Sequence, residues 1–360
     1  MIKWRPVLIL LVLEIFVTLS WLAYHEYQPD ILVQFGFEDY GFAFSILQAF
    51  ILIVTPPLAG WISDRALAKN GSYLTVIYVG VAVVSMVFMA VASVIYIDPS
   101  GFIVYLIPVF IALWLISMNV FRSPALSMLE SIVPQKKLTR VIVIFVLAYD
   151  IIYSLEPNIV DIINAIGATS TFIVGGIGVF IAGFLLVRNF RTLPGHDKQS
   201  EEFANDTKDG KSNFRLVITT GLMYGLLTAF ILKYYPSQDF DIRLIGNQLS
   251  SGQFASFLLI IAAFVSIYFS RIINDTNITR YSHFGFALAF LGAFMLSIGD
   301  SSVVLFMGGI PLVIGFSIVT ISVLPKVFYA LSAKQTVLGI GLFYSCNELI
   351  NGVLDIAAAA

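Results

Sequence analysis

Three acidic residues lie deep inside continuously apolar segments, and they have the clearest capacity for chemistry in this sequence. Glu14, Asp150 and Glu348 each fall near the middle of such a segment, and no Lys or Arg matches them at that depth. An ionised side chain at the centre of a bilayer costs about 2.5–3.5 kcal/mol, so such residues are functional candidates by default. An unpaired carboxylate there can carry a proton or coordinate a cation. For Glu14 and Asp150, a protonated acid hydrogen-bonded to nearby backbone is an equal alternative, whereas for Glu348 it is the weaker one.

Polar residues accompany Glu348 at helical spacing. Glu348, Asn351 and Asp355 stand at positions i, i+3 and i+7, and Asn347 precedes them in an otherwise apolar segment. Residues at this spacing share one face of a helix. The pattern predicts a polar stripe that faces a cavity and contacts a substrate or a coupling ion.

A second polar pair, Asn119 and Arg122, stands at i, i+3 in the fourth apolar segment. Arg122 could bind an anionic group of a substrate, or it could pair with Glu130 inside the protein, and the internal ion pair is the favoured interpretation. Four aromatic residues are candidates for stacking on a ligand ring, although aromatic residues more often serve packing: Trp21, Trp114, Tyr149 and Tyr344.

Other chemistries have no support in the sequence. The three His residues are too far apart for metal-ligand spacing, and no Ser-His-Asp set or Walker-type phosphate loop occurs. Cys346 is the single cysteine and suits a packing role, while His25 is interpreted as a solvated loop residue. The net charge of -2, with dispersed basic residues, disfavours a nucleic-acid partner. We therefore expect neither an enzyme nor a bound cofactor or metal.

The elements that position these residues follow from composition. Of 360 residues, 59% are hydrophobic and 12% are charged, and the mean hydropathy is +0.92. Soluble proteins carry roughly 25% charged residues, so this is an integral membrane protein. Continuous apolar runs of about 20 residues predict membrane-spanning helices and not barrel strands. The fold class is therefore all-α, with eleven expected spans near 7–24, 41–62, 74–97, 102–121, 141–160, 171–187, 215–232, 254–270, 281–299, 302–324 and 336–354.

The basic residues give the orientation. With the N-terminus in the cytoplasm, all of the 20 Lys and Arg residues except Lys233 and Arg243 fall on the cytoplasmic side. This agrees with the positive-inside rule. The first span begins like a signal peptide, but Glu14 interrupts it and no cleavage site follows, so we expect a retained helix. The predicted location is the inner or plasma membrane of the cell, with the end of this sequence outside.

The longest polar segment divides the spans into two sets. It predicts a cytoplasmic linker at 188–214, between a six-helix bundle at 1–187 and a second bundle at 215–360 with five visible helices. Transporters built from two repeats have this layout. The end of the eighth span, at Ser266–Arg271, echoes the end of the second span at Gly60–Arg65, which makes Arg271 the expected counterpart of Arg65.

The segment after the second span carries a recognisable motif. Gly60, Asp64, Arg65 and Lys69 match the loop Gly-x-x-x-Asp-Arg-x-Gly-Arg-Arg, while Leu67 and Ala68 depart from it. In this the chain resembles the major facilitator superfamily, and the stretches 55–65 and 119–126, with Glu130, Pro134 and Arg140, are similar to its glycoside and sucrose cation symporter group. The resemblance implies that the first, fourth, seventh and tenth helices line a central cavity and that the third, sixth and ninth face lipid.

The same motif implies a gate. The start of a helix has unpaired N–H groups and a partial positive charge, which a carboxylate can cap. The resemblance implies that Asp64 docks on the start of the eleventh helix, near Gln335 and Thr336, and closes the cytoplasmic side, while Arg65 pairs across the interface. Alternatively, Asp64 and Arg65 simply end the second span in the headgroup layer.

Two functions follow as hypotheses. The first is a secondary transporter of a small solute, coupled to protons or another cation and working by alternating access. The second is a non-transporting subunit with a transporter fold, held in a larger membrane complex. The superfamily has twelve helices, so a twelfth is either missing from this sequence or absent, and a protein partner could then cover its place. The deep carboxylates favour transport.

Overall fold

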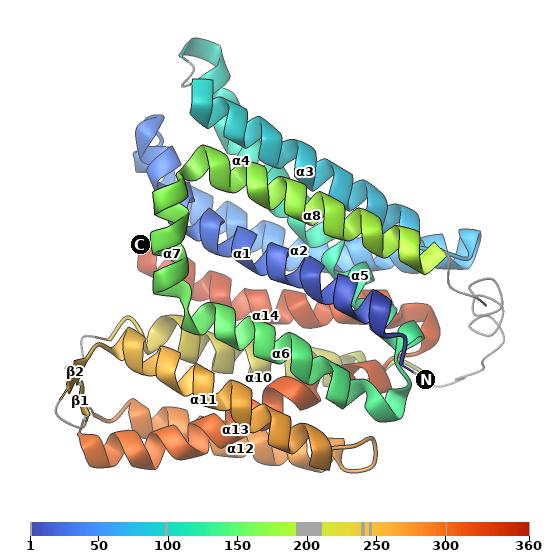
Figure 1. Ribbon diagram of the computed structural model, residues 1–360, viewed down its shortest axis with the longest axis vertical. Coiled ribbons are helices and arrows are strands. Elements are labelled where there is room, and N and C mark those ends of the chain that lie inside the picture. Colours follow the sequence, from blue (N-terminus) through green and yellow to red (C-terminus); the bar gives the residue numbers. More distant parts are fainter. Residues whose placement is uncertain are drawn as a thin grey trace.

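The computed structural model describes residues 2–97, 100–191, 211–238, 242–244, 247–299 and 301–359. Helices dominate these residues and run roughly alongside one another, with the N- and C-termini at opposite ends of the bundle (Figure 1). The predicted all-α class is confirmed. The greater part of the expected linker, 192–210, lies outside the described residues. We call the end of the bundle near Lys3 the N-terminal end, and the other the distal end.

The first half of the chain contributes eight α-helices and three short 3-10 turns. The α-helices are α1 (Trp4–Gln34), α2 (Gly41–Asn70), α3 (Leu74–Ile97), α4 (Ile107–Val120), α5 (Arg122–Ile132), α6 (Leu138–Ser154), α7 (Glu156–Ile166) and α8 (Ala168–Arg191). The 3-10 turns are η1 (Glu38–Tyr40), η2 (Gly101–Leu106) and η3 (Gln135–Lys137).

The second half adds five α-helices: α10 (Phe214–Ala229), α11 (Ser251–Ile272), α12 (Ile278–Leu296), α13 (Ser302–Ala330) and α14 (Thr336–Ala359). A π-helical turn, η4 (Phe230–Tyr234), extends α10, and the 3-10 turn η5 (Ala333–Gln335) precedes α14. Between η4 and α11, strands β1 (Ile242–Leu244) and β2 (Asn247–Leu249) form a small antiparallel pair that the sequence did not predict.

The expected number of spans is not confirmed. Within the described residues, nine helices are long and apolar enough to cross a membrane, and a bent helix pair brings the number to at most ten. The expected span at 281–299 corresponds to α12, which is not among them. Its first turns hold Arg280, Ser282 and His283, so its apolar part is short.

The expected fifth span is bent. It consists of α6 and α7, which meet at 69°. Pro157 stands in the first turn of α7, where it cannot donate a hydrogen bond and its ring crowds the carbonyl four residues earlier, and both effects break a continuous helix. In Figure 1, α7 consequently runs across the ends of α6 and α8.

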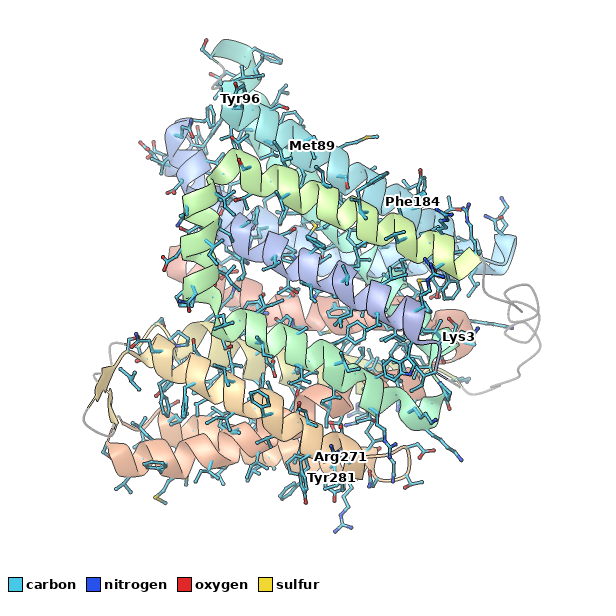
Figure 2. The ribbon with its side chains drawn as sticks, in the orientation of Figure 1. Lys3, Met89, Tyr96, Phe184, Arg271 and Tyr281 are labelled. Atoms are coloured by element: carbon cyan, nitrogen blue, oxygen red, sulfur yellow. The ribbon has the colours of Figure 1, made fainter. Side chains whose placement is uncertain are left out.

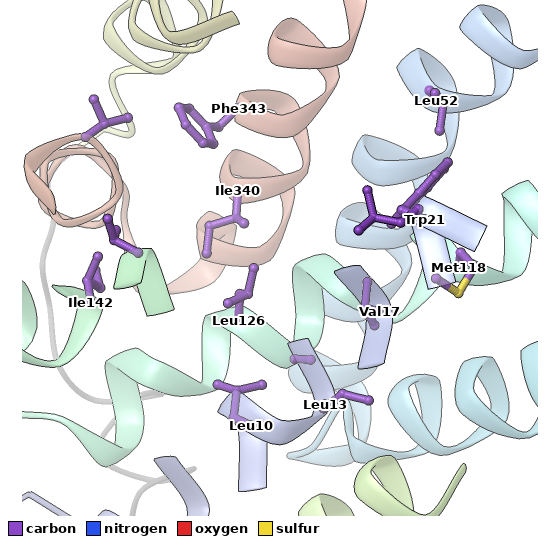
Figure 3. Close-up of a cluster of buried hydrophobic side chains, with 14 of the residues drawn as sticks. Leu10, Leu13, Val17, Trp21, Leu52, Met118, Leu126, Ile142, Ile340 and Phe343 are labelled. Carbon is purple, nitrogen blue, oxygen red and sulfur yellow. The ribbon is translucent and has the colours of Figure 1, made fainter. Parts of the chain in front are cut away.

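Two helix pairs make the most extensive contacts between the halves. The helix α14 lies along α2, and α11 lies along α6. Within each half, α3 packs on α8 and α12 packs on α13. Buried apolar residues from α1, α2, α4, α5, α6 and α14 meet near the centre, as Figure 3 shows for Leu10, Leu126, Ile142 and Phe343. Outward faces are apolar too, with Tyr96 on α3 and Phe184 on α8 exposed (Figure 2), as expected for helices in lipid.

Candidate functional site

A cavity of about 700 Å³ lies between the two halves of the chain. Its lining comes from α1, α2, α5, α6, α7, α10, η4, α13 and α14, with Ser237 just beyond η4. In the described part of the chain, α3, α8, α11 and α12 supply no lining residue. Of the expected coupling residues, Glu14, Arg122, Asp150, Asn347, Glu348 and Asn351 all line this cavity.

Glu14 and Arg122 form an ion pair in the cavity. Nε of Arg122 lies 3.8 Å from Oε2 of Glu14, and the side chains are only 18% and 14% exposed. The guanidinium also lies over the ring of Tyr344, 4.7 Å from its centroid. The expectation that no basic residue reaches the depth of Glu14 is therefore wrong, because α5 brings Arg122 beside it. Arg122 pairs with Glu14 of α1.

The polar stripe around Glu348 faces the cavity. The side-chain amide of Asn347 donates to Oε1 of Glu348 at 3.2 Å, and that of Asn351 donates to the carbonyl of Asn347. Thr228 of α10 donates to Oδ1 of Asn347 at 3.0 Å. Within the described residues Glu348 forms no ion pair. These bonds orient the amides beside the Glu348 carboxylate in the wall of the cavity.

Asp150 is the most deeply buried carboxylate of the cavity. It is 1% exposed, and its Oδ2 atom has no hydrogen-bond partner among the described residues. Its neighbour Tyr149 packs against Tyr153, with ring centroids 4.5 Å apart. A carboxylate held this way is costly while ionised, so a proton or a cation at Asp150 would be stabilised.

Two cavity features near the distal end were not predicted. Nζ of Lys233 lies 2.5 Å from Oδ1 of Asp355, which links the π-turn η4 to α14. His25 lies in α1, not in a loop; its ring stacks on Trp21, and both residues line the cavity. A π-turn shifts side chains around the helix axis, and apolar periodicity does not reveal it.

Asn119 is not part of the cavity lining. It is buried, and its side-chain amide donates to the carbonyl of Leu115 on its own helix. Its helix ends at Val120 and the next begins at Arg122, so the break at Phe121 interrupts the helical spacing that suggested a shared face. Trp114 is likewise buried outside the lining, whereas Tyr149 and Tyr344 lie in it.

Asp64 caps the start of α14. Its Oδ1 accepts a hydrogen bond from the backbone N–H of Val337 at 3.2 Å, and its Oδ2 accepts one from Leu338 at 2.9 Å. Gly60, one turn earlier, allows this approach, because a Cβ there would lie 2.5 Å from the Val337 carbonyl oxygen. A carboxylate at a helix start also gains from the helix dipole. The contact joins α2 to the start of α14 at the N-terminal end.

The two arginines of the expected gate lie at the same end. The Arg65 guanidinium lies 3.7 Å from the ring centroid of Trp61, on its own helix. Arg271 lies in the last turn of α11 (Figure 2). A further bond between the halves near this end runs from the Tyr329 hydroxyl to the carbonyl of Gln135. Midway along α2 and α14, the Ser345 hydroxyl donates to the carbonyl of Ile53.

Comparison with known proteins identifies the fold. The family model of the Major Facilitator Superfamily matches residues 15–353. The crystal structure of the human organic anion transporter MFSD10 (TETRAN) is similar, with a TM-score of 0.67 and 16% identity, over 99% of this chain and 92% of that one. Two crystal structures of the peptide transporter POT are also similar, each with 14% identity over 98% of this chain and 88% of that one. The mutant in complex with alafosfalin has a TM-score of 0.58, and the complex with sulfate has a TM-score of 0.57. No curated protein sequence matches the chain.

Proposed function

The chain belongs to the major facilitator superfamily, a family of membrane transporters and not of enzymes, and from that premise we propose that it moves a small solute by proton-coupled alternating access. The proposed site is the cavity, with Glu14, Arg122, Asp150, Asn347, Glu348 and Asn351 as the residues for substrate and coupling ion. The proposed location is the cell membrane, with the N-terminal end in the cytoplasm, as the distribution of Lys and Arg favours.

Alternating access needs two bodies that rock around the cavity. We take these to be residues 1–187 and 215–360, joined by the linker 188–214. Because α2 pairs with α14 and α6 with α11, rocking would slide these helices past each other. Asp64 on the start of α14 would be one part of the cytoplasmic gate, with Gly60, Arg65 and Arg271 at the same end.

The observation that carries proton coupling is the carboxylate of Glu348, which lines the cavity without an ion pair among the described residues. A nearby cation, such as Arg122 beside Glu14, favours the ionised form of a carboxylate. Glu348 and Asp150 lack that partner, so a proton can neutralise them in a site of low polarity. Arrival and loss of the proton would then bias the two conformations.

The alternative, a structural subunit that does not transport, has less support. A structural subunit has no need for a cavity of about 700 Å³ whose wall contains buried carboxylates. Protein interiors are normally close-packed, so side chains would be expected to fill such a space. The transport hypothesis predicts that the two ends of this cavity open in turn.

Reciprocal cysteine labelling tests the proposal without a known substrate. In a Cys346→Ala background, Leu129→Cys reports on the cavity near the N-terminal end and Ser237→Cys reports on the distal end. In proteoliposomes, a pH gradient should raise labelling at one position and lower it at the other, with Lys136→Cys, exposed outside the cavity, as control. Labelling that is unaffected by pH, or that changes in the same direction at both positions, would contradict alternating access driven by protons.

A further inference from the structure

The cavity has more acidic than basic side chains, so it carries an excess of negative charge when its carboxylates are ionised. Its lining contains five acidic side chains and two basic ones, namely Glu14, Asp150, Glu156, Glu348 and Asp355 against Arg122 and Lys233. A cavity lined mainly by one sign of charge attracts ligands of the opposite sign. The charge excess therefore bears on the class of substrate, which the proposed function leaves open.

Both basic side chains of the cavity already have acidic partners. Arg122 pairs with Glu14, and Lys233 pairs with Asp355. An anionic substrate would compete with these carboxylates for the two cations. It would also face the remaining acidic residues at close range, where like charges repel strongly.

Three cavity carboxylates, Asp150, Glu156 and Glu348, form no ion pair within the described residues. Asp150 is the clearest, since it is 1% exposed and its Oδ2 has no hydrogen-bond partner there. An ionised carboxylate buried without a counter-ion is strongly unfavourable. Either a proton or a positively charged ligand removes this cost.

Aromatic side chains make up much of the same surface. Tyr149, Tyr153, Tyr224, Phe343 and Tyr344 all line the cavity. Aromatic faces bind organic cations, at about 0.5–2 kcal/mol each, and the protein already uses this interaction where Arg122 lies over Tyr344. The volume of about 700 Å³ suits a molecule of drug size.

We propose that the cavity binds a monovalent organic cation with an apolar body, whose charge takes the place of a proton at one of the unpaired carboxylates Asp150 and Glu348. The inference rests on the proposed function for its transport step, though not for binding. Because one carboxylate holds either a proton or the ligand charge, the two compete, and transport runs as exchange of the organic cation for protons. Exchange is the opposite of the symport that the sequence resemblance implied.

A pair of probes with matched shape and opposite charge tests this inference. Tetraphenylphosphonium and tetraphenylborate are nearly the same in size and apolar surface. Calorimetric titration of the purified protein at pH 8 should show saturable binding of tetraphenylphosphonium, with at least tenfold weaker binding of tetraphenylborate. Glu348→Gln or Asp150→Asn, whichever removes the carboxylate that holds the ligand charge, should weaken tetraphenylphosphonium binding at least tenfold, whereas Glu38→Gln, exposed on η1, should leave it unchanged.

The exchange of charge has its own signature. Lowering the pH should weaken tetraphenylphosphonium binding, because protons compete for the carboxylates. The heat of binding should vary with the ionisation enthalpy of the buffer, because protons are released. Preferred binding of tetraphenylborate, or equal binding of tetraphenylphosphonium by folded Glu348→Gln and Asp150→Asn, would overturn the inference. If tetraphenylphosphonium binds as expected but the cysteine labelling is not reciprocal, only the transport proposal is overturned. If the labelling is reciprocal but the protein does not prefer the cation, only the substrate class is overturned.

Discussion

The carboxylate of Asp64 on α2 accepts a hydrogen bond from the backbone N–H of Leu338 in the first turn of α14, although 274 residues separate the two in sequence. A second bond, from Val337, occupies the other oxygen. The carboxylate thus satisfies two of the free N–H groups at the start of that helix. This contact ties the first half of the chain to the second at the N-terminal end, where we propose the gate.

Replacing Asp64 by Asn should loosen this end. The amide keeps the shape, but it lacks the negative charge that favours the helix start, and only its oxygen can accept the N–H bonds. We expect faster labelling of Leu129→Cys in the Cys346→Ala background, by several-fold. Asp39→Asn, exposed on η1 at the distal end, is the matched control. Equal labelling rates in both variants would leave Asp64 as a simple helix terminator.

Gly60→Ala tests the close packing of α2 on α14. The added Cβ would lie 2.5 Å from the carbonyl oxygen of Val337 and 2.7 Å from the Cα of Leu338, so backbone must shift. Overpacking of this kind costs about 1–3 kcal/mol, and it would lengthen both Asp64 bonds. Thermal unfolding should show a lower Tm than wild type. Gly41→Ala on the same helix, with nothing within 4 Å of its Cβ, should not change Tm, and a fall of the same size there would refute the packing argument.

The Glu14–Arg122 ion pair should show strong coupling in a double-mutant cycle. Arg122→Met leaves Glu14 mostly buried without its cation, and breaking a buried pair costs about 3–5 kcal/mol. Adding Glu14→Gln removes the stranded charge, so the double variant should recover much of the loss. Denaturation in detergent measures each member of the cycle. Simple additivity of the two single changes would show that the residues do not interact.

The Lys233–Asp355 pair should behave differently, because its side chains are 32% and 30% exposed. Exposed pairs contribute about 0–1 kcal/mol and weaken with salt. Lys233→Gln should therefore change stability little. Because it bridges η4 and α14 at the distal end, it should alter labelling of Ser237→Cys, more at low than at high ionic strength. A loss of stability comparable to that of Arg122→Met would contradict this assignment.

The sequence predicted those features that depend on local composition. Long apolar runs identified most helices, and the spacing of Glu348, Asn351 and Asp355 identified a polar face because one continuous helix carries all three. The contact of Asp64 with α14 came from a motif that the family shares, and composition alone would not have suggested it.

The remaining features depend on tertiary structure or on breaks in a helix. Arg122 meets Glu14 only because α5 packs near α1, which no local pattern encodes. Asn119 does not line the cavity with Arg122, because the helix breaks at Phe121 between them. Lys233 was expected on the outer side of the membrane. It lies in a π-turn and pairs with Asp355, which is far away in sequence, and no local pattern predicts either feature.

A distance measurement across the N-terminal end tests the central claim, that protonation of the cavity carboxylates controls opening. Spin labels at Lys69→Cys on α2 and Lys334→Cys on η5, both exposed, in the Cys346→Ala background, report the separation of the two halves by pulsed electron resonance. We predict two distances whose populations change with pH in the otherwise wild-type protein, and a loss of that pH dependence when Glu348→Gln and Asp150→Asn are combined. A single distance at every pH, or the same pH response in the combined variant, would contradict the account.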